Sequence, residues 1–420
     1  MSRRKTLLAR TGALVVVAAL VAVVTTPVVG GAAPSVRGFD GSTLKIGGMG
    51  LHNNFPDGAN GAQGRFKAFN DDNEIKGIKI EYVGYLDDKQ DPATALSVGR
   101  QLVQQDQVFA VIPNLSQYTP GDYFTQQHVP WFGWGFDATY CSATPTTTGY
   151  GFGYNGCLIP PDPKRMPDSG GQLYKYVSEK TGSDKPTLAM FSNETDSGKN
   201  AVATQASGYA GAGFDIVYAK GLLPPPPLGD VTPYVQELLS SNDGSPPDAM
   251  VCLLSIDCLE IWQQLKANNY AGTFQSPLYS DLLAGALAGT VASVQYVPFD
   301  VNTPAQQKMI DQIHAFKPDA AINSGVAASY FAADMFIATL KQLKKQKLDI
   351  TPENVQKVAA KTTFEVKGLF GPTKFPDSYV RPTPACTGIV LAEGGTWSTV
   401  EPYFCSNKTF KVQQKYLDAA

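Results

Sequence analysis

The chain has 420 residues, 43% of them hydrophobic, and a formal net charge of only −3. It holds no long basic run, so we exclude nucleic acid as a partner. A chain of this length exceeds one comfortable hydrophobic core, which predicts two domains.

The N-terminal segment has the composition of a secretory signal peptide. Four cations, Arg3, Arg4, Lys5 and Arg10, precede an apolar run over 12–24 and a small-residue stretch over 30–33. The apolar run is shorter than the roughly 20 residues that span a bilayer, so we expect a cleaved signal peptide over 1–33. An uncleaved anchor remains an alternative, because 11–36 carry no charge.

Arginine and cysteine positions bear on the export route and on lipid anchoring. The Arg3-Arg4 pair allows twin-arginine export, although Thr6 stands where a large apolar residue is usual. The first cysteine is Cys141, so no lipid can be attached through an N-terminal cysteine. We expect a protein of a periplasm-like space or the cell exterior.

Strand-like and helix-like segments alternate along the first half of the chain. Apolar residues recur at helical spacing over 58–72, where Ala62, Phe66 and Phe69 share one face, and over 92–105, which begins at Pro92. Short apolar strands are predicted at 44–46, 78–82 and 108–112. This alternation is typical of an α/β fold with a parallel sheet.

The rhythm breaks over 138–167, which is rich in Thr, Gly, Tyr and Pro, and we interpret that segment as a loop. A second alternating series then follows. Its predicted helices are 171–180, 197–211, 232–240, 257–269, 304–315, 323–345 and 352–361, and its predicted strands are 187–191, 215–219, 249–254, 276–279 and 293–297, with further strands near Thr373 and Thr387.

Six cysteines in an exported chain indicate disulfides. Fifteen pairings are possible in principle, and pairing sequence neighbours gives the simplest set: Cys141–Cys157, Cys252–Cys258 and Cys386–Cys405. The cysteines form no C-x-x-C pair and the three histidines are scattered, so we expect no metal site.

A set of short motifs resembles a known family. Gly61-Ala62, Phe69-Asn70, Ile75-Lys76-Gly77, Asp87-Asp88 and Asp91-Pro92 resemble the first lobe of the periplasmic solute-binding proteins of the leucine/isoleucine/valine-binding type, which serve ABC importers. The similarity continues to Lys367-Gly368 and Phe370-Gly371-Pro372.

This resemblance implies a topology. It implies the type I periplasmic-binding fold: two doubly wound parallel-sheet lobes, joined by three crossover segments, with a ligand cleft between them. Lobe 1 would hold 43–165 and 283–383, lobe 2 would hold 166–282 and 384–405, and 406–420 would form a C-terminal tail.

The resemblance also implies a site in the first lobe. Ser116 and Gln117 match positions that bind the ligand's carboxylate, although Ser116 could instead cap a helix. The segment Trp134, Gly135, Phe136 and Asp137 matches the second half of that site, where aromatic side chains favour an apolar or aromatic ligand and core packing is the alternative. Phe55 is a candidate cover for the cleft.

Further candidates follow strands of the second series. Asp196 and Ser197 follow a strand, but Ser197 stands where relatives commonly have a tyrosine, and it could simply cap a helix. Asp257 matches the position that binds a ligand's ammonium, with helix capping as the alternative. Asp281 is a weaker candidate of the same kind.

The sequence contains no G-x-S-x-G, H-E-x-x-H or Walker motif, so we expect neither an enzyme nor a cofactor. We predict a monomeric substrate-binding component of an ABC importer, with a membrane permease as partner. Its ligand would be a branched-chain amino acid or a larger apolar or aromatic solute, possibly a carboxylate. A ligand-sensing receptor module of the same fold is the alternative, and a secreted hydrolase is a third.

Overall fold

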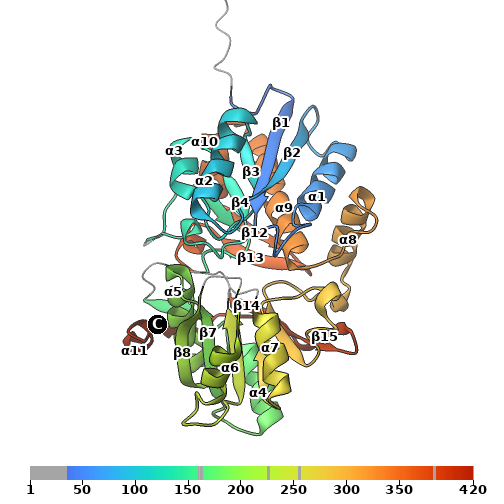
Figure 1. Ribbon diagram of the computed structural model, residues 1–420. Coiled ribbons are helices and arrows are strands. Elements are labelled where there is room, and N and C mark those ends of the chain that lie inside the picture. The colour runs from blue at the N-terminus through green and yellow to red at the C-terminus, as the bar shows by residue number, and fades with distance from the viewer. Residues whose placement is uncertain are drawn as a thin grey trace, which may run out of the picture. The chain divides into compact units, whose positions relative to one another are not determined.

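The computed structural model describes residues 36–142, 144–158, 160, 164–224, 228–253, 257–381 and 385–419, without the side chains of Asp196, Ser197 and Ala385. The predicted signal peptide lies outside these residues. Two parallel-strand sheets with flanking helices form the fold (Figure 1). Within the described part of the chain, no helix is both long and apolar enough to cross a membrane.

The first sheet is entirely parallel, with the order β2-β1-β3-β4-β5. Its strands are β1 (Thr43–Gly50), β2 (Lys79–Asp87), β3 (Ala110–Leu115), β4 (Trp131–Gly133) and β5 (Gly151–Gly153). All of β3 is buried, as expected of a central strand covered on both faces.

Strand β5 corrects the interpretation of 138–167 as a loop without strands. Its sequence, Gly-Phe-Gly, gives no strand signal, because glycine is depleted in strands. Here glycine is needed at Gly151, since a Cβ would lie 2.5 Å from the ring of Trp131 on the neighbouring strand.

Helices cover both faces of the first sheet. On one face lie α1 (Asn60–Asp71) and α9 (Ser324–Lys345), with α8 (Pro304–Phe316) against α1 and α10 (Pro352–Ala359) against α9. On the other lie α2 (Pro92–Arg100) and α3 (Gly121–Gln126). The helix predicted over 92–105 is confirmed, with its last part, Gln101–Gln105, in π conformation.

The second sheet has seven strands in the order β15-β14-β11-β10-β9-β7-β8. The five strands β7 (Thr187–Asn193), β8 (Asp215–Leu223), β9 (Ala249–Leu253), β10 (Thr273–Gln275) and β11 (Thr290–Val294) are parallel and repeat the order of the first sheet. Two antiparallel strands, β14 (Ala385–Glu393) and β15 (Thr396–Ser406), extend it.

The two faces of the second sheet are covered by different helix pairs. The helices α4 (Gly171–Thr181) and α5 (Asp196–Ala212) pack on one face, and α6 (Thr232–Leu239) and α7 (Cys258–Ala267) pack on the other (Figure 1). Each sheet is therefore doubly wound, as the sequence predicts.

The strand predicted over 276–279 is wrong. The observed strand is β10, which ends at Gln275, and 276–279 is the loop that follows it. Pro277 lacks the N–H that a ladder needs, and the true strand is only three residues long.

Strand β11 also lies in the second sheet, although the predicted division places residues from 283 onward in lobe 1. The chain therefore passes from the second sheet back to the first lobe after Val294, where β11 ends. The strand near Thr373 is β13 (Phe370–Lys374), which pairs with β12 (Thr363–Val366) in a small two-stranded sheet.

The segment predicted as a C-terminal tail is ordered. Strand β16 (Thr409–Lys411) pairs with β6 (Arg165–Pro167), and α11 (Gln414–Leu417) packs on α5. All three predicted disulfides are present. Short 3-10 turns lie at Ala138–Tyr140, Asp281–Leu283, Phe299–Val301 and Asp377–Tyr379.

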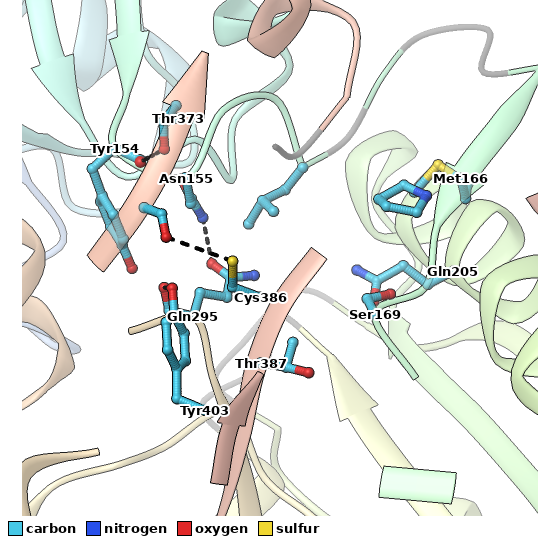
Figure 2. A pocket seen from close by; sticks show the side chains of 13 residues that line it. Tyr154, Asn155, Met166, Ser169, Gln205, Gln295, Thr373, Cys386, Thr387 and Tyr403 are labelled. Carbon is cyan, nitrogen blue, oxygen red and sulfur yellow. Dashed lines mark hydrogen bonds between the residues drawn. The ribbon is translucent and has the colours of Figure 1, made fainter. Parts of the chain in front are cut away.

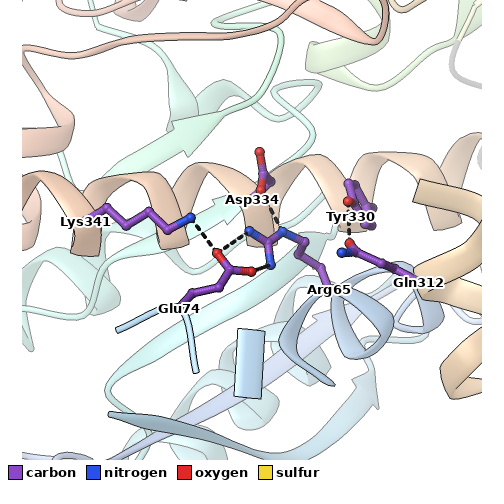
Figure 3. A network of polar contacts seen from close by, with 6 residues as sticks. All are labelled: Arg65, Glu74, Gln312, Tyr330, Asp334 and Lys341. Carbon is purple, nitrogen blue, oxygen red and sulfur yellow. Dashed lines mark hydrogen bonds and ion pairs between the residues drawn. The ribbon is translucent and has the colours of Figure 1, made fainter. Parts of the chain in front are cut away.

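An ion-pair network joins α1 to α9 across the first lobe (Figure 3). The buried guanidinium of Arg65 donates two hydrogen bonds to Glu74, at 2.6 and 3.0 Å, and one to Asp334 at 2.7 Å. Lys341 also contacts Glu74, at 2.5 Å. The network therefore links Arg65 and Glu74 to Asp334 and Lys341, which lie far away in the sequence.

Candidate functional site

A cavity of about 360 Å³, here called the central cavity, lies where strands of both sheets end. The segments after β1, β3 and β4 line it from the first sheet, and those at the ends of β9, β10 and β11 line it from the second. Carboxyl ends of parallel strands are where α/β folds bind ligands, so the topology itself positions this site.

Aromatic rings from the first sheet form one wall. Phe55 follows β1, and its ring centroid lies 5.9 Å from that of Trp134, which follows β4. Trp134 meets Phe136 edge-on at 5.3 Å. The indole N–H of Trp134 is buried and has no hydrogen-bond partner among the described residues.

The second sheet contributes the loop after β10 and the end of β11. Tyr279 and Tyr296, from these two segments, line the cavity with rings stacked at 6.4 Å. Leu282 also lines it, yet its side chain is 78% exposed. An apolar side chain exposed at a cavity rim can be covered by a ligand or by closure of the cleft.

The first turn of α9 completes the lining with Asn323, Ser324 and Gly325. Ser324 bonds to Tyr296 at 2.9 Å between their hydroxyl oxygens, and its backbone N–H donates to Tyr279 O at 3.2 Å. Gly325 is required because Phe55 packs against it, so that an added Cβ would lie 2.5 Å from that ring.

A smaller space of about 40 Å³, here called the annex, adjoins the central cavity and shares Leu158, Ser169, Gln205, Gln295 and Thr387 with it. Figure 2 shows Ser169 and Gln205 on one side of the annex, facing Asn155 and Gln295 on the other. Asn155, in the first segment that connects the two sheets, donates a hydrogen bond to Gln295, in the second connecting segment.

Charge is sparse in this lining. Asp57 is the sole carboxyl group among the described lining residues, and they include no lysine, arginine or histidine. Asp57 already pairs with Lys317 at 3.5 Å. The other polar side chains of the described lining are mainly amides and hydroxyls.

A family model of periplasmic binding proteins matches residues 47–388. This chain belongs to the periplasmic binding protein family. No curated protein matches it at a significant level.

Solved structures agree with this assignment. A fatty acid ABC transporter substrate-binding protein from Thermomonospora curvata aligns with a TM-score of 0.68 and 18% identity, over 89% of this chain and 95% of its own. A solute-binding protein from R. palustris in complex with benzoate aligns at 0.64 and 15%, over 87% and 98%.

The branched-chain amino acid transporter substrate binding protein LivJ from Streptococcus pneumoniae, in complex with isoleucine, aligns at 0.62 and 18%, over 86% and 100%. At these identities the similarity shows the fold, which is the type I periplasmic-binding fold predicted from the sequence. The predicted kinship with leucine/isoleucine/valine-binding proteins is likewise confirmed.

Four predicted site residues of this periplasmic binding protein line the central cavity: Phe55, Gln117, Trp134 and Phe136. Ser116, Gly135 and Asp137 do not appear in its lining. Gly135 is instead a packing position, because a Cβ there would lie 1.7 Å from the carbonyl oxygen of Gly156.

Ser116 and Asp137 belong to a buried polar cluster beside the cavity. The hydroxyl of Ser116 accepts from the backbone N–H of Tyr118 at 2.9 Å and bonds to the fully buried Asp88. Asp137 accepts from the N–H groups of Thr139 at 2.8 Å and Thr119 at 3.4 Å. Burial raises the pKa of Asp137 to about 6, and the charge of Asp88 adds to the effect.

The remaining acidic candidates also lie outside the described lining. Asp257 is buried at the start of α7 and accepts from the backbone N–H of Leu228 at 3.4 Å. Asp281 is on the exposed turn beside Leu282, although burial of its carboxyl raises its pKa. The side chains of Asp196 and Ser197 lie outside the described residues.

Several lining residues were not predicted, among them Gln205 and Tyr209 on α5, Tyr279 after β10, Tyr296 after β11 and Thr387 on β14. A correct end for β10 would have indicated Tyr279, since it follows a strand. Gln205 and Thr387 carry no such signal, because they lie within a helix and a strand.

Proposed function

We propose that this periplasmic binding protein is the extracytoplasmic substrate-binding component of an ABC importer that captures a small, largely apolar organic solute. The central cavity carries this proposal, because it is concave, shared by two doubly wound sheets and lined by Phe55, Trp134, Phe136, Tyr279 and Tyr296. Such pockets bind small molecules through apolar walls and a few polar groups.

The size and chemistry of the cavity favour a solute larger than a branched-chain amino acid. These five aromatic residues at the carboxyl ends of strands offer flat apolar area, and Leu282 offers an exposed apolar rim. The ligands named for similar proteins, benzoate, fatty acids and isoleucine, all carry an apolar part.

The mechanism would be capture and release without covalent change. Two sheet-based lobes joined by three crossings can close over a solute by bending at those crossings. Closure would cover Leu282 and the aromatic wall, and the closed form would dock on a membrane permease. Sensing through another partner protein would use the same closure.

Binding is tested by thermal shift with leucine, isoleucine, valine, aromatic acids and amides, and fatty acids. A ligand at 100 times its dissociation constant should add about 2.7 kcal/mol to the free energy of unfolding. Small-angle scattering with the best ligand should show a smaller radius of gyration. If no small solute stabilises the protein, the proposal fails.

Transport is tested in cells that lack the gene. Uptake of the labelled ligand should fall and should return when the gene is restored. If uptake is unchanged in those cells although the purified protein binds the ligand, a ligand-sensing role would be favoured over import.

A further inference from the structure

We propose that the solute is uncharged and that a carboxamide or hydroxyl group of the solute enters the annex to bond with Ser169, Gln205 and Thr387. This inference rests on the proposed function and names the chemical class of its ligand.

An anionic group would find no cation in the described lining. Among the described lining residues Asp57 is the one carboxylate, and none of them is a lysine, an arginine or a histidine. Removing a charge from water without a partner is costly, whereas a neutral polar group needs only hydrogen bonds.

In the loop after β3, where a ligand carboxylate was expected, Ser116 is already engaged and only the neutral amide of Gln117 reaches the described lining. The hydroxyl of Ser116 is engaged with the Tyr118 N–H and the Asp88 carboxyl. Asp88 and Asp137 are both buried nearby, so ionised carboxyls would repel a second anion at this loop.

An ammonium group fares no better. Asp57 is held by Lys317 at 3.5 Å, and the carboxyl of Asp257 contacts the N–H of Leu228 outside the described lining. A zwitterionic amino acid would therefore leave both of its charges without a matching partner among the described residues.

The annex offers neutral groups instead. No side-chain hydrogen bond to another described residue is formed by Ser169, Gln205 or Thr387, and all three line both the annex and the central cavity. They come from three separate segments that converge there (Figure 2). Hydroxyl and amide side chains donate and accept, which suits a carboxamide or hydroxyl.

The annex volume fits the same conclusion. About 40 Å³ exceeds what one water needs and can hold a terminal polar group, but not a ring. The ring or chain of the solute would remain in the central cavity against Trp134 and Phe136.

The test uses matched acid and amide pairs on the purified full-length protein. The pairs are benzoate and benzamide, phenylacetate and phenylacetamide, and octanoate and octanamide, measured by calorimetry and thermal shift at pH 7. We expect at least one amide to bind at least tenfold more tightly than its acid.

Variants locate the polar group. Gln205→Met and Thr387→Val remove hydrogen-bonding atoms at similar volume, and each should weaken binding of the best amide about five- to tenfold. Gln236→Met is the matched control, because Gln236 is exposed on α6 and should leave affinity unchanged. The melting temperature of each free variant shows that it is folded.

Acids that bind as tightly as their amides would overturn the inference while leaving the binding function intact. Tight amide binding that Gln205→Met and Thr387→Val both leave unchanged would overturn the annex assignment. If no acid, amide or amino acid binds at all, the proposed function fails together with the inference.

Discussion

Replacing Arg65 by methionine should destabilise the protein strongly, because Arg65 is the hub of the network between α1 and α9 (Figure 3). Its side chain is only 6% exposed, and it neutralises both Glu74 and Asp334. Methionine keeps much of the volume but leaves Asp334 without its cation and leaves Glu74 with Lys341 alone.

The magnitude follows from the pKa of Glu74. Burial opposes its ionisation, but hydrogen bonds from Arg65 and Lys341 outweigh burial and lower the pKa from 4.5 to about 2. Such a difference corresponds to about 3 kcal/mol of stability at pH 7. Because Glu74 is 15% exposed, we expect about 2 kcal/mol from it, and about 3 kcal/mol in all for Arg65→Met.

The pH dependence has a definite sign. Since the folded pKa of Glu74 is depressed, its contribution is present above about pH 4.5 and is lost as the pH falls towards 2. Glu74→Gln should therefore cost about 2 kcal/mol at pH 7 and much less at pH 3.

Urea unfolding followed by circular dichroism, at pH 7 and pH 3, measures these values. The matched control is Lys67→Met, on the same helix, because the pair of Lys67 with Asp71 is exposed and should contribute under about 0.5 kcal/mol. An Arg65→Met variant within 1 kcal/mol of wild type, or a Glu74→Gln variant with an unchanged pH profile, would refute the reasoning.

Three further predictions concern the first lobe. Burial raises the pKa of Asp137 to about 6, so its contribution to the free energy of unfolding should fall by up to about 3 kcal/mol as the pH rises from 4 through 6. Asp137→Asn should remove that fall, and melting profiles of the two proteins that run parallel across this pH range would contradict this. Gly135→Ala should cost about 2–3 kcal/mol in urea unfolding, because its Cβ would meet the Gly156 carbonyl at 1.7 Å, whereas Gly285→Ala, in open space, should be neutral; equal costs would count against the packing account. Replacing both Cys141 and Cys157 by serine opens a loop of 16 residues and should cost about 3 kcal/mol by differential scanning calorimetry, and an unchanged melting temperature would argue that the loop is held without the bond.

The long elements of this fold are predictable from sequence because their patterns repeat over many residues. The helix predicted over 323–345 is α9, and that over 304–315 is α8, each with an apolar stripe and an asparagine or threonine cap. Strands such as β5 and β10 are three residues long, which is too short for alternation to be visible.

Site residues were predictable where they follow a buried strand directly. Gln117 and Trp134, which follow β3 and β4 and match site positions of the resembled family, both line the central cavity. The sequence could not tell Ser116 from Gln117, because which neighbour faces the cavity depends on loop conformation and on Asp88, a partner 28 positions earlier. Gln205 and Thr387 come together only through packing of α5 and β14 around the crossings.

The annex lies at the meeting point of the three connections between the sheets. Asn155 belongs to the first, Gln295 to the second, and Thr373 and Thr387 flank the third (Figure 2). A solute bound in the annex would contact these connecting segments as well as the walls of the central cavity. The affinity for the solute and the extent of closure would then depend on the same coupling free energy, so a substitution in the connecting segments should alter both together.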